Sequence, residues 1–172
     1  MSVVAVKVFE NKFEMSSDSI MVHGWSSQTK DNTFKYAKMF RTKDMVVGCV
    51  GDVSESTAFS LFLKDHKLSD LRLGEEALQQ LIWDFKRWLY EKTDSEEPLT
   101  NQMIIGTKFG VWLFFGISCL EITSNFAIGA GEDFARGALA MGASTKKACE
   151  VACELSAFCE YPVKTEKMNF SK

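Results

Sequence analysis

The run Val3-Val4-Ala5-Val6 near the N-terminus constrains the fold more than any other stretch of the sequence. Side chains of a β-strand point alternately to opposite faces, so a strand that is apolar at consecutive positions must be covered on both faces. A polar break at Glu10-Asn11-Lys12, with an apolar residue again at Phe13, predicts that the run from Val3 to Phe9 is the first strand of a β-hairpin. We therefore expect this strand in the centre of a sheet that lies between two other layers.

The rest of the sequence alternates between groups of strands and pairs of helices. A polar stretch, 25–35, is expected to be a loop, and a strand pair that turns at Thr42-Lys43-Asp44 is expected at 36–41 and 45–50. The apolar periodicity then predicts helices at 54–66 (capped by Ser54 or Ser56) and 75–92, strands at 102–107, 109–115, 118–123 and 126–129, helices at 134–141 and 145–157 (capped by Ser144), and a last strand starting at Val163. Because both helix pairs need a sheet face, the economical packing is an α+β fold, a four-layer αββα sandwich.

Size and composition limit the functions that this chain can have. With 172 residues and 46% apolar content, residues 1–172 are expected to form a single domain. The formal net charge of −3, without blocks of Lys or Arg, lacks the basic surface of a nucleic-acid-binding protein. The most apolar stretch, 109–120, is too short to cross a bilayer and contains two glycines, so no membrane partner is expected.

The cysteines and histidines predict neither disulfides nor a metal centre. The five cysteines are an odd number and no signal-peptide pattern precedes them, which favours reduced thiols and a cytoplasmic location. His23 and His66 are too far apart for a metal site, and Cys149 and Cys153, at i and i+4 among small apolar residues, are more typical of a helix core. The GAGED stretch lacks the lysine of a phosphate-binding loop, so we expect no cofactor.

Four stretches, distributed along the chain from residue 16 to residue 163, carry a resemblance to a known family. They are SSDSIMVHGW at 16–25, AKMFRTKDMVVGCVGD at 37–52, FAIGAGEDFARGALAMGAS at 126–144 and ACEVACELSAFCEYPV at 148–163. In this order and spacing they resemble HslV and the β subunits of proteasomes, including the proteasome-like proteins of bacteria and their phages. These are N-terminal-nucleophile (Ntn) hydrolases of a threonine-type peptidase class, and the resemblance implies the αββα fold.

The resemblance also implies a set of catalytic residues. Ser2 would be the nucleophile once Met1 is removed, with its own α-amino group as general base. Asp18 lies 16 residues after Ser2, the separation that the family keeps between its nucleophile and an aspartate. Lys38 matches the lysine that favours the ionised hydroxyl, and Gly51 matches the glycine whose N–H faces the oxyanion. From a hairpin turning near residues 10–11, we also expect Ser2 and Asp18 on one sheet face, opposite each other or one diagonal step apart.

Several positions depart from the family pattern and leave a second interpretation open. Serine replaces the usual threonine at Ser2, and an alignment that follows the apolar residues would instead place Met1 over the nucleophile. Ala130 occupies the place of a serine near the α-amine, Ser156 stands where many members have an aspartate, and Cys159 lies near another polar position. The alternative is therefore a catalytically inactive structural or regulatory protein with the same fold.

The resemblance further implies the partners of the chain. Proteins of this kind form homo-oligomeric rings, act on peptides or unfolded proteins, and depend on a separate unfolding ATPase for folded substrates. This chain has no nucleotide-binding motif of its own. Neither the number of subunits in the ring, nor the ATPase, nor the peptide preference follows from the sequence.

Overall fold

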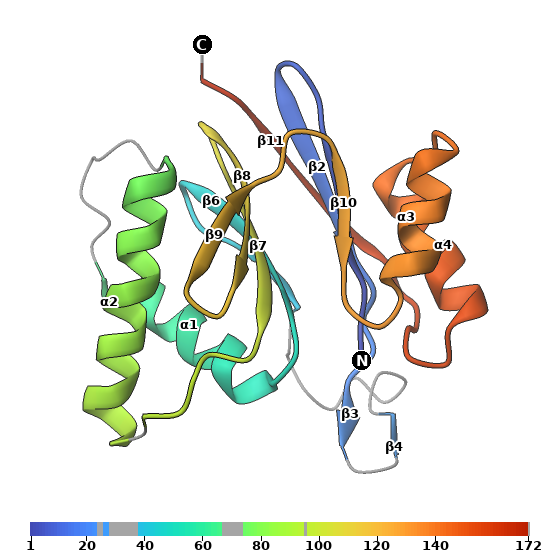
Figure 1. Cartoon of the computed structure of the whole chain (residues 1–172). Coiled ribbons are helices and arrows are strands. Elements are labelled where there is room, and N and C mark those ends of the chain that lie inside the picture. Colours follow the sequence, from blue (N-terminus) through green and yellow to red (C-terminus); the bar gives the residue numbers. More distant parts are fainter. Residues whose placement is uncertain (24–25, 28–37, 67–73, 95, 172) are drawn as a thin grey trace.

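The computed structural model describes residues 1–23, 26–27, 38–66, 74–94 and 96–171. Two antiparallel sheets pack face to face (Figure 1). Helices α1 (Val53–Asp65) and α2 (Glu75–Thr93) cover the outer face of one sheet, and helices α3 (Glu132–Ala140) and α4 (Thr145–Leu155) cover the outer face of the other. This arrangement confirms the predicted four-layer αββα sandwich. Of the loop expected at 25–35, only Ser26–Ser27 is described; it forms β4, which pairs with β3 (Val22–His23).

The first sheet contains the predicted N-terminal hairpin. Its strands are β1 (Val4–Val8), β2 (Lys12–Ser17), β10 (Asn125–Ile128) and β11 (Lys164–Asn169), in the order β10-β1-β2-β11. On one face of β1, Val4 and Val6 join the core between the sheets, while on the other Val3 and Ala5 pack against α3 and α4. The expectation of a central strand covered on both faces is therefore confirmed.

The second sheet packs closely on β1 and β2. Its strands follow the chain order: β5 (Met39–Arg41), β6 (Met45–Val50), β7 (Gln102–Thr107), β8 (Gly110–Phe115) and β9 (Ser118–Glu121). A Cβ atom on Gly48 of β6 would lie 2.6 Å from Val4 Cγ1 and 2.9 Å from Met15 Sδ. Because glycine has no Cβ, β6 can approach β1 closely at this point. Residues 36 and 37 of the predicted strand 36–41 lie outside the described residues.

The two helix pairs begin and end near their predicted positions. They are α1 (Val53–Asp65), α2 (Glu75–Thr93), α3 (Glu132–Ala140) and α4 (Thr145–Leu155). Ser144 caps α4 as predicted, accepting a hydrogen bond from Lys147 N. The cap of α1 was wrongly predicted as Ser54 or Ser56: the Asp52 carboxylate accepts from the backbone N–H groups of Ser54 and Glu55. Asp52 lies directly after Gly51, so the start of α1 is tied to a predicted site residue.

No helix in the described parts of the chain is both long and apolar enough to cross a membrane.

Candidate active site

The N-terminus lies at one end of the sandwich, at the lower end of the first sheet's strands in Figure 1. Ser2 is only 3% exposed, whereas Met1 before it is 53% exposed. The Ser2 carbonyl accepts a hydrogen bond from Gly131 N at 3.1 Å, and the Ser2 hydroxyl donates to the Met1 carbonyl. A Cβ atom on Gly129 would lie 2.5 Å from the Ser2 carbonyl oxygen and 3.1 Å from Val50 Cγ1. The end of β6 therefore lies close to the backbone of Ser2.

Asp18 is the most completely bonded side chain of the site. It is 1% exposed, and each carboxylate oxygen accepts two hydrogen bonds. Oδ1 accepts from Val3 N at 2.9 Å and from Lys38 Nζ at 2.8 Å, and Oδ2 accepts from Ile20 N at 3.0 Å and Glu160 N at 3.2 Å. A buried carboxylate is tolerated when its lone pairs are satisfied in this way. Asp18 thus joins the backbone after Ser2 to the segment that follows α4.

Lys38 is the buried cation that pairs with Asp18. Its Nζ lies 2.8 Å from Asp18 Oδ1, and its backbone carbonyl accepts from Cys49 N at 2.8 Å, which fixes Lys38 beside β6. Burial lowers the pKa of the Lys38 ammonium from its ordinary value, and the Asp18 carboxylate opposes part of that lowering. The site therefore holds a desolvated ammonium that gives up its proton more readily than a surface lysine.

The expected placement of Ser2 and Asp18 on one sheet face is wrong. The ladder pairs Val4 with Ser17 and Val8 with Phe13. Continued by one residue, it pairs Val3 with Asp18, and the hydrogen bond from Asp18 N to Val3 O at 3.2 Å agrees with this register. Facing residues share a face and successive residues alternate, so Asp18 shares the face of Val3 rather than that of Ser2. The cause is the turn, closed by Phe9 N and Lys12 O, which shifts the register by one residue from the expected one.

Gly51 follows the last residue of β6 and is exposed. Its φ of +125° is a conformation that residues with a Cβ rarely adopt. Its predecessor Val50 is the residue that lies beside Gly129 and the Ser2 carbonyl. The fold therefore brings together the predicted residues Ser2, Asp18, Lys38 and Gly51 from four separate segments of the chain.

The residues that depart from the family pattern lie around the same end of the molecule. Ala130 is exposed between Gly129 and Gly131, both of which have close contacts with the N-terminal segment. Ser156 ends α4, and its hydroxyl accepts a hydrogen bond from Phe158 N at 3.2 Å. Cys159 is buried and precedes the residue whose N–H binds Asp18. The hydrogen bonds that the backbone N–H groups of Ile20, Glu160 and Gly131 donate to the site were not predicted. Nearly every residue type has a backbone N–H, so the amino-acid types alone do not indicate which of these groups take part.

The cysteines near the site are protonated thiols rather than thiolates. Burial raises the pKa of Cys153 to about 12 and that of Cys159 to about 11, and it raises the pKa of Cys149 as well. A protonated thiol is a poor nucleophile and a poor metal ligand. In the described parts of the chain, no group of three His, Cys, Asp or Glu side chains is arranged to hold a metal ion.

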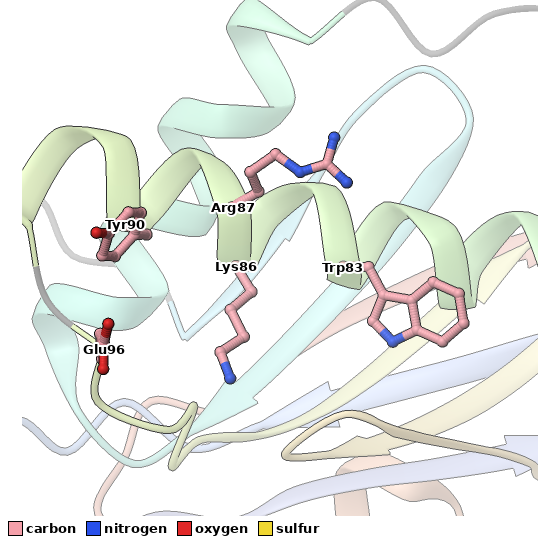
Figure 2. A pocket seen from close by; sticks show the side chains of 5 residues that line it. All are labelled: Trp83, Lys86, Arg87, Tyr90 and Glu96. Carbon is pink, nitrogen blue, oxygen red and sulfur yellow. The ribbon is translucent and has the colours of Figure 1, made fainter.

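A separate groove lies on the outer helix layer, away from the N-terminus. It has a volume of about 530 Å³ and is open to solvent along α2. Figure 2 shows the five side chains that line it: Trp83, Lys86, Arg87, Tyr90 and Glu96. None of them contributes to the Asp18–Lys38 pair, so the groove is distinct from the candidate active site.

Comparisons with solved structures identify the fold independently. BPH from Thiobacillus denitrificans is 15% identical to this chain, with a TM-score of 0.84, and the match covers 98% of both chains. The structure of BPH in complex with epoxomicin is 18% identical, with a TM-score of 0.81, and the match covers 99% of this chain and 100% of that one. HslV from Trypanosoma brucei is 16% identical with a TM-score of 0.71, covering 97% of this chain and 99% of its own. Anbu, an ancestral β-subunit from Yersinia bercovieri, is 12% identical with a TM-score of 0.74, covering 96% and 80%.

No protein-family model matches the sequence, and a search of curated proteins found no significant match. The likeness therefore rests on three-dimensional structure at low sequence identity. The chain has the fold of HslV and other proteasome-like Ntn hydrolases, as its sequence motifs predicted.

Proposed function

We propose that this protein is a proteasome-like peptidase that hydrolyses peptide bonds with Ser2 as its N-terminal nucleophile after removal of Met1. The observation that carries the proposal is the buried Asp18–Lys38 pair, whose carboxylate also binds the backbone N–H of the residue after Ser2. A buried ion pair with four satisfied acceptor sites is a costly arrangement to maintain, and it is typical of a functional site. The HslV-like fold supports the same conclusion.

In the proposed reaction, Ser2 Oγ attacks the carbonyl carbon of the substrate while its α-amino group takes the hydroxyl proton. Lys38, held by Asp18, favours the ionised hydroxyl by its positive charge. The tetrahedral intermediate places its negative oxygen at the Gly51 N–H. Collapse breaks the C–N bond, and the leaving amine takes the proton from the α-ammonium group. Water, activated by the α-amine, then hydrolyses the ester on Ser2 Oγ and regenerates the enzyme.

This reaction requires that Met1 be absent. While Met1 is present, the nitrogen of Ser2 belongs to an amide and cannot accept a proton. Met1 is exposed and is followed by a small residue, so an aminopeptidase can reach the bond. Removal also frees the Ser2 hydroxyl from its hydrogen bond with the Met1 carbonyl.

The partners follow from the same proposal. A homo-oligomeric ring of this domain would shield the sites from folded proteins in the cytoplasm, and an unfolding ATPase would supply unfolded chains as substrates. Light scattering on the purified protein tests the ring. A strict monomer at micromolar concentration would contradict both the ring and compartmentalised proteolysis.

A catalytically inactive ring protein is the second candidate. Two observations favour it: Ala130 has no hydroxyl to orient the α-amine, and the Ser156 hydroxyl binds the neighbouring Phe158 N–H. A site with altered supporting groups is typically slow or inactive.

One experiment separates the two candidates. The protein is expressed from Met1, without an N-terminal tag, in a host that removes methionine, and its intact mass is measured to confirm a free Ser2 amine. It is then exposed to a panel of fluorogenic peptides and to epoxomicin, the ligand of the BPH complex, with Ser2→Ala as control. The peptidase is expected to cleave peptides or to form a covalent adduct that Ser2→Ala abolishes. A processed protein that does neither supports the inactive ring protein.

A further inference from the structure

We propose that Asn101 is a positioning residue that sets the direction of the Gly51 N–H for the oxyanion, an inference that rests on the proposed function. Asn101 directly precedes β7 and is 1% exposed. It contacts neither Ser2 nor the Asp18–Lys38 pair through any hydrogen bond of the described residues. It would therefore act on the Gly51 N–H only by holding the turn formed by Gly51 and Asp52 in place.

One side-chain amide holds both backbone groups of Asp52. Asn101 Oδ1 accepts from Asp52 N at 2.5 Å, and Asn101 Nδ2 donates to the Asp52 carbonyl at 2.8 Å. The second Nδ2 hydrogen binds Ser56 Oγ at 2.9 Å. The donors and the acceptor of this buried amide are thus all directed at the residues that follow Gly51.

The position of Gly51 explains why such a restraint matters. The Gly51 N–H is part of the peptide unit that joins Val50 to Gly51. Because glycine rotates more freely about its backbone bonds than any other residue, the orientation of that unit is held at the Gly51 end only if the next unit is restrained as well. The preceding unit is held by β6, and the following unit carries Asp52 N, which Asn101 holds. A Cβ atom on Gly51 would lie 2.8 Å from Asn101 Cγ, so the side chain also packs directly on the glycine. Asn101 therefore restrains the turn both by hydrogen bonds and by contact.

Asn101 is itself fixed by the first turn of α1. The Glu55 carboxylate accepts from Asn101 N at 3.1 Å through Oε1 and from Thr100 N at 2.9 Å through Oε2. Ser56 Oγ donates to the Asp52 carbonyl at 3.0 Å, which closes the network. Since the Asp52 side chain already caps α1, the Asn101 amide is not needed to begin that helix. This favours a role in the geometry of the turn.

The kinetic test uses processed protein with a free Ser2 amine. Asn101→Ala is expected to lower kcat by about 10- to 100-fold, less than the loss of an oxyanion donor, with KM changed by less than about twofold. Asn101→Asp keeps an acceptor for Asp52 N but places a buried carboxylate oxygen against the Asp52 carbonyl oxygen, so its kcat is expected to fall at least as far as that of Asn101→Ala. Ser144→Ala, which removes the hydrogen bond that caps α4, is the control for general destabilisation and should keep the kcat of the parent protein.

A second measurement does not depend on activity. Hydrogen exchange of the Asp52 amide, followed by NMR, is expected to accelerate at least about tenfold in Asn101→Ala but not in Ser144→Ala, because Asn101 Oδ1 is the acceptor of that amide. Unchanged exchange would overturn the proposal whatever the kinetics. Faster exchange with an unchanged kcat would also overturn it, since the turn would then be held for stability alone. If the parent protein is inert although Ser2 is free, the proposed function fails, and the exchange rate still decides whether Asn101 holds the turn.

Discussion

Replacing Asp18 by asparagine keeps the shape of the side chain but removes its charge at a position that is 1% exposed. Each Asp18 oxygen accepts two hydrogen bonds, and an amide nitrogen in place of one oxygen would face two donors instead. Lys38 would lose its only counter-charge among the salt bridges of the described residues. Removing one partner of a buried ion pair costs about 3–5 kcal/mol.

The titration of Lys38 gives an independent upper limit for the electrostatic part of this loss. A lysine can avoid an unpaired charge by releasing its proton, and moving its pKa from the ordinary value of 10.5 to pH 7 costs about 5 kcal/mol. The two values agree, so we expect Asp18→Asn to lower the free energy of unfolding by about 3–5 kcal/mol at pH 7. This is a large part of the stability of a typical domain, about 5–15 kcal/mol.

The assay is unfolding in guanidinium chloride, followed by tryptophan fluorescence at one fixed protein concentration. Asp18→Asn, Lys38→Met and the double variant form a mutant cycle. We expect a coupling of about 2–3 kcal/mol between the two positions, because the double variant contains no unpaired buried charge. A loss below about 1 kcal/mol for Asp18→Asn, or a coupling near zero, would refute the reasoning.

The stability lost in Asp18→Asn should depend on pH in a direction that follows from the pKa of Lys38. In folded Asp18→Asn the Lys38 pKa lies further below 10.5 than in the parent, since the carboxylate that raises it is gone. The unfolded variant then binds more protons than the folded one, so its stability rises with pH from the lowered folded pKa up to 10.5. The difference in the free energy of unfolding between the parent protein and Asp18→Asn should therefore become smaller between pH 7 and pH 10. A difference that is constant over this range would contradict the assignment of the loss to Lys38.

Three further outcomes are expected. Gly48→Ala should destabilise the protein by about 1–3 kcal/mol, because its Cβ would collide with Val4. Gly137→Ala, at a position of α3 where a Cβ would contact no other atom, should stabilise it by about 0.5–1 kcal/mol. The Tm of each variant is measured by calorimetry, and equal Tm shifts would contradict the close sheet packing at Gly48. Cys159, with a pKa raised to about 11 by burial, should react with iodoacetamide at pH 8 about 100-fold more slowly than free cysteine, as measured by mass spectrometry; rapid labelling would disprove its burial. If the Lys38 ammonium assists Ser2, kcat/KM should fall on the alkaline side with a midpoint below 10.5, and a midpoint at or above that value would argue against its role.

The periodicity of the sequence predicted much of the fold. The strands 45–50 and 102–107 begin and end where they were expected, and the doubly apolar run at Val3 led to a central strand covered on both faces. These predictions succeed because a strand buried on one face has an apolar residue at every second position, and a strand buried on both faces has apolar residues at consecutive positions. The cap of α1 was missed because Asp52 and Ser54 are both good cap residues, and local sequence does not rank them.

The candidate site was predictable only as a set of residues. The spacing of Ser2, Asp18, Lys38 and Gly51 suggested their roles through the family resemblance, and the fold places them at one end of the sandwich. Their mutual geometry was not predictable, because a one-residue change of hairpin register moves Asp18 to the face of Val3.

Tertiary structure alone decided how Asp18 and Gly51 are supported. Besides Lys38 Nζ and the nearby Ile20 N–H, Asp18 accepts from the distant backbone N–H groups of Val3 and Glu160, and every residue except proline has such a group, so no residue type reveals these two contacts. Asn101 holds Asp52 from 49 residues away along the chain. The sequence determined which faces of the strands and helices are buried, because that depends on local residue types. The long-range hydrogen bonds of the site, such as those of Lys38 and Glu160 with Asp18 and of Asn101 with Asp52, depend on distances that exist only once distant segments have packed together.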